Sequence, residues 1–319
     1  MIQHLPPTKS PRRSLSGELH PSPFLRWAGG KRRLTHTLIE TFPDDFNPLK
    51  HRFYEPFVGG GALAFALGNT GADFFVPGEN LHINDMNPEL INTYTVIRDS
   101  VSQLITELEN LKKQVNERNY YRIRNTIPTG KIKRAARFIY LNKTCYNGLW
   151  RVNSKGLFNV PFDKSSSTNL FDEENLRACS QRLKNATITN ESFEKAISKA
   201  RRGDLVYLDP PYIPLTPSAS FSAYAKEGFG EKDHQLLALT IDKLSEKGVF
   251  VLLSNSDTPL TRKIFRNHLT LRRVLMRRTM SASGTNRKHV FEVLGMNYSH
   301  LHGSTMGELE LISRPKPTV

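Results

Sequence analysis

The stretch Val206-Tyr207-Leu208-Asp209-Pro210-Pro211-Tyr212 decides how the rest of the chain is interpreted. The apolar run 205–208 predicts a buried parallel strand, which must end at the two prolines because proline cannot continue the ladder. Asp209 is therefore expected at the carboxyl end of a strand, where open α/β sheets bind ligands. There the Asp209 carboxylate, the Pro210 carbonyl and the Tyr212 ring could converge on a planar ring with an exocyclic amine. The same residues also suit a simple strand-ending turn, so the interpretation depends on the rest of the chain.

The charge of the chain favours a polyanionic partner. Lys and Arg total 45 against 30 Asp and Glu, which gives a formal charge of +15 and a pI near 9.8. Residues 110–160 hold twelve Lys or Arg and one acid, and residues 258–291 hold nine and no acid. Either stretch alone could be an ordinary solvated face, but two of them favour a nucleic-acid surface.

Other classes of protein are disfavoured by composition. No apolar run approaches the length of a membrane-spanning helix, and no signal segment opens the chain. Two cysteines, Cys145 and Cys179, are too few for a disulfide framework or a four-ligand zinc site. We therefore expect a cytoplasmic protein with no metal and no membrane partner.

Glycine-rich turns near the start of the ordered chain favour a nucleotide-like ligand. Residues 52–62 include Phe57 and Gly59 and run into an apolar segment, which predicts a strand, a glycine turn and a helix. This would be the first unit of a doubly wound sheet, and it lacks the Gly-Lys-Ser/Thr ending of a phosphate-binding loop. An earlier Gly-Gly-Lys that ends at Lys31 could approach a ligand or be only a turn.

An acid follows the second predicted strand. The predicted strand 81–83 ends at Asn84-Asp85, about 20 to 30 residues past the glycine turn, where an acid typically accepts hydrogen bonds from ribose hydroxyls. The alternative is that Asp85 caps the helix that begins near Pro88, a role that suits Asn87 better. Phe193, which follows another short strand, could lie against an adenine ring or be an ordinary core residue.

A predominantly helical region between residues 96 and 140 carries interleaved basic residues and leads into a loop over 142–162. The loop mixes amide and guanidinium side chains that can read base edges with side chains that can wedge or stack, including Trp150. We interpret it as a target-recognition region, with an aromatic-rich packing loop as the alternative. Residues 221–224 are expected in a mobile loop.

Seven motifs in this order resemble the Dam-type DNA adenine-N6 methyltransferases, over roughly residues 23–298. They are Trp27-Ala-Gly-Gly-Lys31, Glu55-Pro-Phe-Val-Gly-Gly-Gly61, Ile83-Asn-Asp85, Tyr146-Asn-Gly-Leu149 with Arg151 and Asn153, Asp209-Pro-Pro-Tyr212, Phe221-Ser-Ala-Tyr224 and Ser254-Asn-Ser-Asp257. The resemblance implies S-adenosylmethionine as methyl donor and an adenine within duplex GATC as target. Trp150 departs from the pattern, since many relatives carry a smaller residue there.

The resemblance also implies roles for particular residues. Catalysis would fall to Asp209, Pro210 and Tyr212. The cofactor would be bound by Asp209 together with Trp27, Lys31, Phe57, Gly59, Asp85 and Phe193. The residues that read the bases would lie in the loop 142–162, namely Tyr146, Asn147, Leu149, Arg151 and Asn153.

The expected architecture is α/β, a doubly wound, mostly parallel (Rossmann-like) methyltransferase sheet with an inserted, largely helical DNA-recognition domain. Residues 1–22 would be a disordered leader, 23–95 and 180–298 the S-adenosylmethionine-binding catalytic domain, 96–179 the recognition insertion and 299–319 a tail. We expect double-stranded DNA as partner, no obligate protein partner and a monomer.

Alternative functions stay open at this stage. Relatives with Asn-Pro-Pro-Tyr methylate protein glutamine, and those with Ser-Pro-Pro-Trp or Ser-Pro-Pro-Tyr often methylate cytosine, so Asp209 favours adenine. Charge alone also allows an RNA substrate. A catalytically silent DNA-binding regulator is the alternative from another class, and intact Asp209 and Tyr212 disfavour it. The pattern does not distinguish an enzyme that acts alone from the partner of a restriction nuclease.

Overall fold

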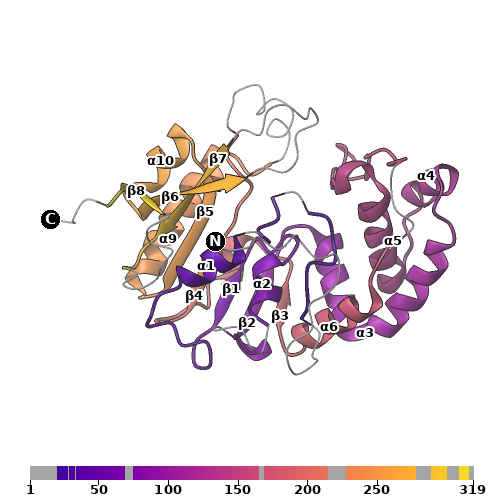
Figure 1. The fold of residues 1–319 in the computed structure, drawn as a ribbon, viewed down its shortest axis with the longest axis horizontal. Coiled ribbons are helices and arrows are strands. Elements are labelled where there is room, and N and C mark those ends of the chain that lie inside the picture. The colour runs from indigo at the N-terminus through magenta and orange to yellow at the C-terminus, as the bar shows by residue number, and fades with distance from the viewer. Residues whose placement is uncertain are drawn as a thin grey trace, which may run out of the picture. The chain divides into compact units, whose positions relative to one another are not determined.

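The computed structural model describes residues 20–27, 29–32, 34–68, 75–164, 169–214, 228–277, 289–299 and 309–315. The chain divides into two compact units, Met1–Thr35 with Val58–Asn190 and His36–Phe57 with Glu191–Val319. Figure 1 draws the elements of both units. Within the described residues, no helix is long and apolar enough to cross a membrane. Each unit combines segments that are far apart in the sequence.

The first unit joins two parallel strands to a group of helices (Figure 1). Strand β2 (Leu81–Asn84) pairs in parallel with β3 (Thr187–Thr189). The helices are α2 (Ala62–Ala66), α3 (Pro88–Lys112), α4 (Glu117–Asn125), α5 (Lys131–Thr144) and α6 (Glu173–Leu183), with the 3-10 turns η1 (Gly78–Asn80) and η2 (Tyr146–Gly148). Helix α3 packs along α5 and α6. The helices expected between residues 96 and 140 are therefore present.

The start of α3 is set by local side-chain chemistry. Asn87 is the N-cap, and its side-chain oxygen accepts hydrogen bonds from the backbone N–H groups of Glu89 and Leu90. Pro88 follows at a position where a helix has no use for a backbone N–H. The capping role belongs to Asn87, so Asp85 is available for another task.

A buried cluster supports the segment that follows α5. Isolated bridges between Cys145 and Phe162, and between Val152 and Phe158, fold this segment into hairpin-like turns. The aromatic and aliphatic side chains beneath it come from α4, α5 and the segment itself. The buried members are Tyr120, Ile123, Tyr140, Leu141, Cys145, Phe158, Val160 and Leu170.

The second unit contains a sheet in the order β1-β4-β5-β7-β6-β8. Strands β1 (Phe53–Glu55), β4 (Leu205–Leu208) and β5 (Phe250–Ser256) are parallel, and β7 (His289–Met296), β6 (Thr270–Arg277) and β8 (Glu310–Ser313) add antiparallel pairings. The helices are α1 (Thr35–Glu40), α7 (Phe193–Ala196), α9 (Glu231–Glu246) and α10 (Pro259–Phe265). The predicted strand 205–208 is confirmed, as is the α/β, Rossmann-like class with mostly parallel strands.

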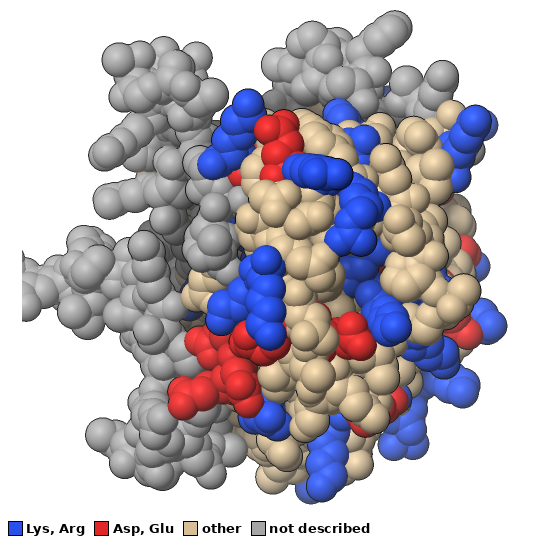
Figure 2. Space-filling model, turned by 90° about the vertical axis from the view of Figure 1, so that its right-hand side faces the viewer, with Lys and Arg blue, Asp and Glu red and all other residues tan. Residues whose placement is uncertain are grey.

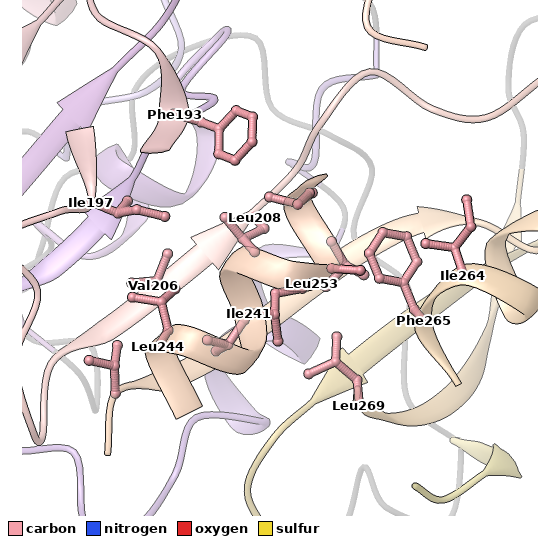
Figure 3. Close-up of a cluster of buried hydrophobic side chains, with 14 of the residues drawn as sticks. Phe193, Ile197, Val206, Leu208, Ile241, Leu244, Leu253, Ile264, Phe265 and Leu269 are labelled. Carbon is pink, nitrogen blue, oxygen red and sulfur yellow. The ribbon is translucent and has the colours of Figure 1, made fainter. Parts of the chain in front are cut away.

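The core of the second unit lies between its strands and helices. Side chains from β4 and β5 meet those from α9 and α10 (Figure 3). The labelled residues are Phe193, Ile197, Val206, Leu208, Ile241, Leu244, Leu253, Ile264, Phe265 and Leu269. All four residues of β4 are buried, as expected for a central strand that reads as a continuous apolar run.

Some expectations fall wholly or partly on residues that are not described. Residues 1–19 of the expected leader and the expected loop 221–224 lie outside the described residues. At the end of the leader, Ser22 exchanges backbone hydrogen bonds with the side chain of Asn175 on α6. Within the tail, β8 pairs with β6, a strand that the sequence analysis did not anticipate.

Candidate functional site

Asp209 lies directly after β4 and is held by a relay of hydroxyl groups. The Ser254 hydroxyl donates to Asp209 Oδ1 over 2.8 Å. The Tyr207 hydroxyl and Ser254 Oγ are 2.9 Å apart, and both residues are fully buried. Because Ser254 uses its one proton toward Asp209, Tyr207 must donate to Ser254. Burial, followed by the charge of Asp209, raises the pKa of Tyr207, so the phenol keeps its proton.

Tyr212 is held from the neighbouring antiparallel strand. Its hydroxyl donates to Glu292 Oε2 on β7 over 2.7 Å. Burial raises the pKa of Tyr212 well above its usual value, and the charges of Asp209 and Glu292 raise it further. The phenol is therefore neutral, and the hydrogen bond fixes the position of its hydroxyl end.

The backbone after Tyr212 is fixed by β5. Asn255 Oδ1 accepts from the backbone N–H of Ile213 over 3.2 Å, and the Ser256 hydroxyl donates to the Ile213 carbonyl. Asn255 and Ser256 are both buried. Thus the segment Asp209–Ile213 is anchored to β5 by side chains at both of its ends.

His234 on α9 lies in the core beneath the same segment. Its ring meets Phe229 and Phe265 edge-on, and it is fully buried. Burial lowers the pKa of His234 to about 4, although Asp233 and the carbonyl of Pro211 oppose this shift. The imidazole is therefore neutral at ordinary pH.

Phe57 and Phe193, both expected at the cofactor, belong to an aromatic group in the second unit. Their ring centroids are 5.6 Å apart, and Phe229 completes the group at 5.5 Å from Phe57 and 5.9 Å from Phe193. Phe193 is only 8% exposed and also packs in the core cluster. Its core role is thus plain in the structure, and the half-buried Phe57 offers the larger free ring surface.

In the first unit, the glycine-rich turn is held by hydrogen bonds to both backbone polar groups of Gly59. The Gly59 N–H donates to Asp85 Oδ2 over 3.1 Å, and the Gly59 carbonyl accepts from the Tyr94 hydroxyl over 2.9 Å. Gly59 has a φ of +46°, and a Cβ there would lie 2.8 Å from the Trp27 ring. Only glycine fits this close approach, so Trp27, Gly59 and Asp85 are brought together.

Asp85 is a largely buried carboxylate, and each of its two oxygens accepts a hydrogen bond from a backbone N–H. Its Oδ1 accepts from the Asn87 N–H over 2.9 Å, and its Oδ2 accepts from Gly59. Burial raises the pKa of Asp85, while the two backbone donors act in the opposite direction. Carboxylate oxygens can each accept more than one hydrogen bond, so capacity for hydroxyl donors is left.

Lys31 closes the neighbouring Gly-Gly-Lys turn. It is 5% exposed, and its Nζ donates to the Gly29 carbonyl over 2.8 Å. The ammonium group is thereby placed on the backbone of its own turn.

The predicted base-reading residues lie on the turns after α5. Tyr146 is 51% and Leu149 39% exposed, and Asn147 has a φ of +54°. The Arg151 guanidinium donates to Asn159 Oδ1 over 2.8 Å, which orients it. The side chain of Asn153, in contrast to that of Arg151, is bonded to the backbone of its own turn: its oxygen accepts from the N–H groups of Lys155 and Leu157.

Trp150 packs against two aromatic rings of the same unit. Its ring centroid is 4.1 Å from that of Phe138 and 4.6 Å from that of Phe158. It therefore packs inward, unlike its neighbour Leu149, which is exposed.

Basic side chains are spread over one side of the first unit. Figure 2 shows the side at the right of Figure 1, where α3 to α6 lie, and Lys and Arg occupy more of it than Asp and Glu. Exposed members from this region are Lys112, Lys113, Arg118, Arg122, Lys131 and Lys133. Such a surface attracts a polyanion in a salt-dependent manner.

A family model, D12 class N6 adenine-specific DNA methyltransferase, matches residues 27–280. The chain belongs to this family. The match extends over most of both units and includes the Asp209 segment, the Gly59 turn and the turns after α5. The described residues of this methyltransferase contain no group of His, Cys, Asp and Glu that could hold a metal ion.

Curated relatives agree with the family. The methyltransferase is 37% identical over 286 residues to the type II methyltransferase M1.LlaDCHI of Lactococcus lactis, with 87% of this chain and 96% of the relative covered. It is 37% identical over 291 residues to the type II methyltransferase M.MjaIII of Methanocaldococcus jannaschii, covering 86% and 99%. It is also 34% identical over 291 residues to the DNA adenine methylase of Haemophilus influenzae, covering 89% and 96%.

Sequence reasoning missed several residues that position this methyltransferase's site. Ser254 was noted only as part of a motif, and Tyr207 only as part of an apolar strand. Glu292 carried a usable signal, since it is the first acid after the acid-free stretch 258–291. Tyr94 carried none, because its partner Gly59 lies far away in the sequence.

The buried His234 gives the methyltransferase a pH-dependent stability. Its folded pKa of about 4 lies below the unfolded value of roughly 6.5, so the unfolded chain binds the proton more readily between these values. Stability is therefore lost as the pH falls through this window, by about 3 kcal/mol at most. Urea unfolding of His234→Leu should show a shallower loss between pH 6.5 and 4 than wild type. His36→Leu, which changes an exposed histidine on α1, should keep the wild-type slope, and equal slopes for all three proteins would contradict the assignment.

Proposed function

We propose that this chain transfers a methyl group from S-adenosylmethionine to the N6 amine of a flipped adenine in duplex DNA, within GATC. The observation that carries the proposal is the end of β4, where Ser254 holds the Asp209 carboxylate and Glu292 holds the Tyr212 ring. An anionic acceptor beside an oriented aromatic ring suits a planar base with an exocyclic amine.

The described residues fit S-adenosylmethionine in chemistry. The Gly59 turn can lie against the Trp27 ring only because it lacks a Cβ, and Asp85 supplies carboxylate oxygens of the kind that ribose hydroxyls bind. The residues proposed to hold the cofactor are those that the sequence indicates, Trp27, Lys31, Phe57, Gly59, Asp85, Phe193 and Asp209. When bound, it would supply a methyl group on a positively charged sulfur.

The chain's own groups would prepare the amine for attack. The lone pair of an adenine amine is delocalised into the ring, which makes the amine a weak nucleophile. Hydrogen bonds from its N–H groups to Asp209 and to the Pro210 carbonyl would favour a geometry in which the lone pair is free, and would stabilise the positive charge that develops on nitrogen. The hydroxyl relay through Ser254 aims the carboxylate in advance, so little reorganisation is needed at the moment of reaction.

Adenine in a duplex would have to leave the base stack to meet Asp209. Flipping costs a few kcal/mol, and stacking on Tyr212 would recover part of it. The exposed basic residues of the first unit would hold phosphates, which position the duplex without reading it. Tyr146, Asn147, Leu149 and Arg151 would contact the neighbouring base pairs, and Asn153 would shape the hairpin that carries them.

We also propose the division of labour expected from the sequence. Residues 23–95 and 180–298 would bind the cofactor and carry out transfer, and residues 96–179 would recognise the target. The enzyme would act as a monomer on double-stranded DNA.

Removing the Asp209 carboxylate tests the proposed reaction. Asp209→Ala should lose more than nine-tenths of methyl transfer, or about 1.4 kcal/mol of transition-state stabilisation, while duplex binding persists because phosphate contacts supply most of the affinity. Asp209→Asn, which keeps the shape and removes the charge, should also be impaired. The measurement is transfer of a labelled methyl group to a GATC duplex, with the methylated base identified by mass spectrometry. Retention of more than about a tenth of wild-type turnover by Asp209→Ala, or a methylated cytosine as product, would refute the proposal.

Arg151→Ala separates reading of the sequence from holding of the DNA. A guanidinium presents two donors that match the two acceptors of guanine in the major groove, which is worth about 1 to 3 kcal/mol of discrimination. Methylation of GATC and of each singly substituted duplex by Arg151→Ala should reveal relaxed selectivity at one guanine. Lys133→Ala, which changes an exposed lysine on α5, should instead weaken binding to every duplex alike. The same fold-loss on every duplex for Arg151→Ala would make it a backbone contact.

A further inference from the structure

We propose that Asn142 and Trp150 are positioning residues that couple cofactor binding to recognition of the target sequence. The inference rests on the proposed function, because it takes the Trp27 motif as cofactor-binding and the turn Tyr146–Leu149 as base-reading. All the residues involved lie in the first unit. Three independent contacts support it.

The first contact is an amide clamp. Asn142 on α5 is fully buried, and its Oδ1 accepts from the backbone N–H of Arg26 over 2.8 Å. Its Nδ2 donates to the Arg26 carbonyl over 2.7 Å and to the Gly148 carbonyl over 3.0 Å. Arg26 directly precedes Trp27, so one side chain ties the start of the cofactor motif to the base-reading turn. Both N–H groups of the Asn142 amide are used, so the side chain is fixed by its partners at both segments.

The second contact is direct apposition of the two segments. Gly148 has a φ of +64°, and a Cβ at this position would lie 2.4 Å from the Cβ of Arg26. The backbone of the turn therefore contacts Arg26 so closely that position 148 has room for a hydrogen atom but not for a Cβ. The segment that contains Arg26 and the turn that contains Gly148 therefore cannot move closer together, so a shift of one displaces the other.

The third contact is a row of aromatic rings. Trp27, Phe138, Trp150 and Phe158 follow one another with centroid separations of 6.2, 4.1 and 4.6 Å. At one end, the Trp27 ring lies against the Gly59 turn. At the other end, Phe158 belongs to the buried cluster beneath the turns. The row thus joins the glycine turn to the recognition segment through Phe138, which is fully buried.

Together these contacts connect the Trp27 motif, proposed to bind the cofactor, to the turn Tyr146–Leu149, proposed to read the target. A close-packed interior transmits displacement because it has few voids to absorb it. Occupancy at Trp27 should then bias the arrangement of the base-reading turn, and a bound duplex must bias cofactor affinity by the same factor. The Trp150 ring fills the row between Phe138 and Phe158.

The test uses S-adenosylhomocysteine, which cannot donate a methyl group, as the cofactor probe. Calorimetry would give its Kd with and without a GATC duplex, and with a duplex carrying one substituted pair. In wild type, GATC should tighten the probe about fivefold or more relative to the substituted duplex. Trp150→Leu should bring this ratio close to one, and Trp150→Phe, which keeps a ring, should retain part of it.

Phe171→Leu is the matched control. Phe171 is a partly buried aromatic residue packed on the same cluster but outside the row, so its loss should destabilise without changing the ratio. Thermal unfolding would confirm that each variant is folded. If Trp150→Leu keeps the wild-type ratio, or if Phe171→Leu lowers it equally, the inference is overturned. Absence of methyl transfer by wild type would instead refute the proposed function, while transfer to GATC without any coupling would refute only this inference.

A second measurement does not depend on the folding of Trp150→Leu. The chain has two tryptophans, Trp27 and Trp150, and both lie in the row. In Trp27→Phe, the remaining emission comes from Trp150 and should change when saturating S-adenosylhomocysteine binds. Unchanged emission at saturation would contradict the coupling.

Discussion

The position of one carboxylate, that of Asp209, depends on a chain of hydrogen bonds that starts in the core of the sheet. Tyr207 and Ser254 stand on adjacent parallel strands, and their hydroxyls meet because the strands are paired. Asp209, directly after β4, accepts the last hydrogen bond of this relay from the Ser254 hydroxyl. The sheet thus fixes the direction of the carboxylate.

The first unit follows the same physical rule with different groups. There the backbone of Gly59 is held by Asp85 on one side and by Tyr94 on the other, so the glycine turn is rigid before any ligand binds. Preorganised donors and acceptors lower the reorganisation needed at the transition state. Both units thus contain a segment that the surrounding strands and helices hold in place by hydrogen bonds.

Features encoded by neighbouring residues could be predicted from the sequence, and those made by distant residues could not. The strand 205–208 and the Asn87 cap depend on a few consecutive side chains, and both predictions are confirmed. The partnership of Glu292 with Tyr212 joins residues 80 positions apart, and that of Asn142 with Arg26 spans 116. Strand β8 was missed because its short run gains its stability from pairing with β6. The packing of Trp150 on Phe138 could not be predicted, since a ring that can stack on a base can equally pack on another ring.

The central claim is that the hydroxyl relay aims Asp209 for methyl transfer, and the single-turnover rate of Ser254→Ala tests it most directly. The rate should be measured with enzyme in excess over a GATC duplex at saturating S-adenosylmethionine. The account predicts a rate about tenfold or more below wild type, with the dissociation constants of cofactor and duplex unchanged, since the variant leaves every proposed binding residue in place. A single-turnover rate within about twofold of wild type would contradict the claim.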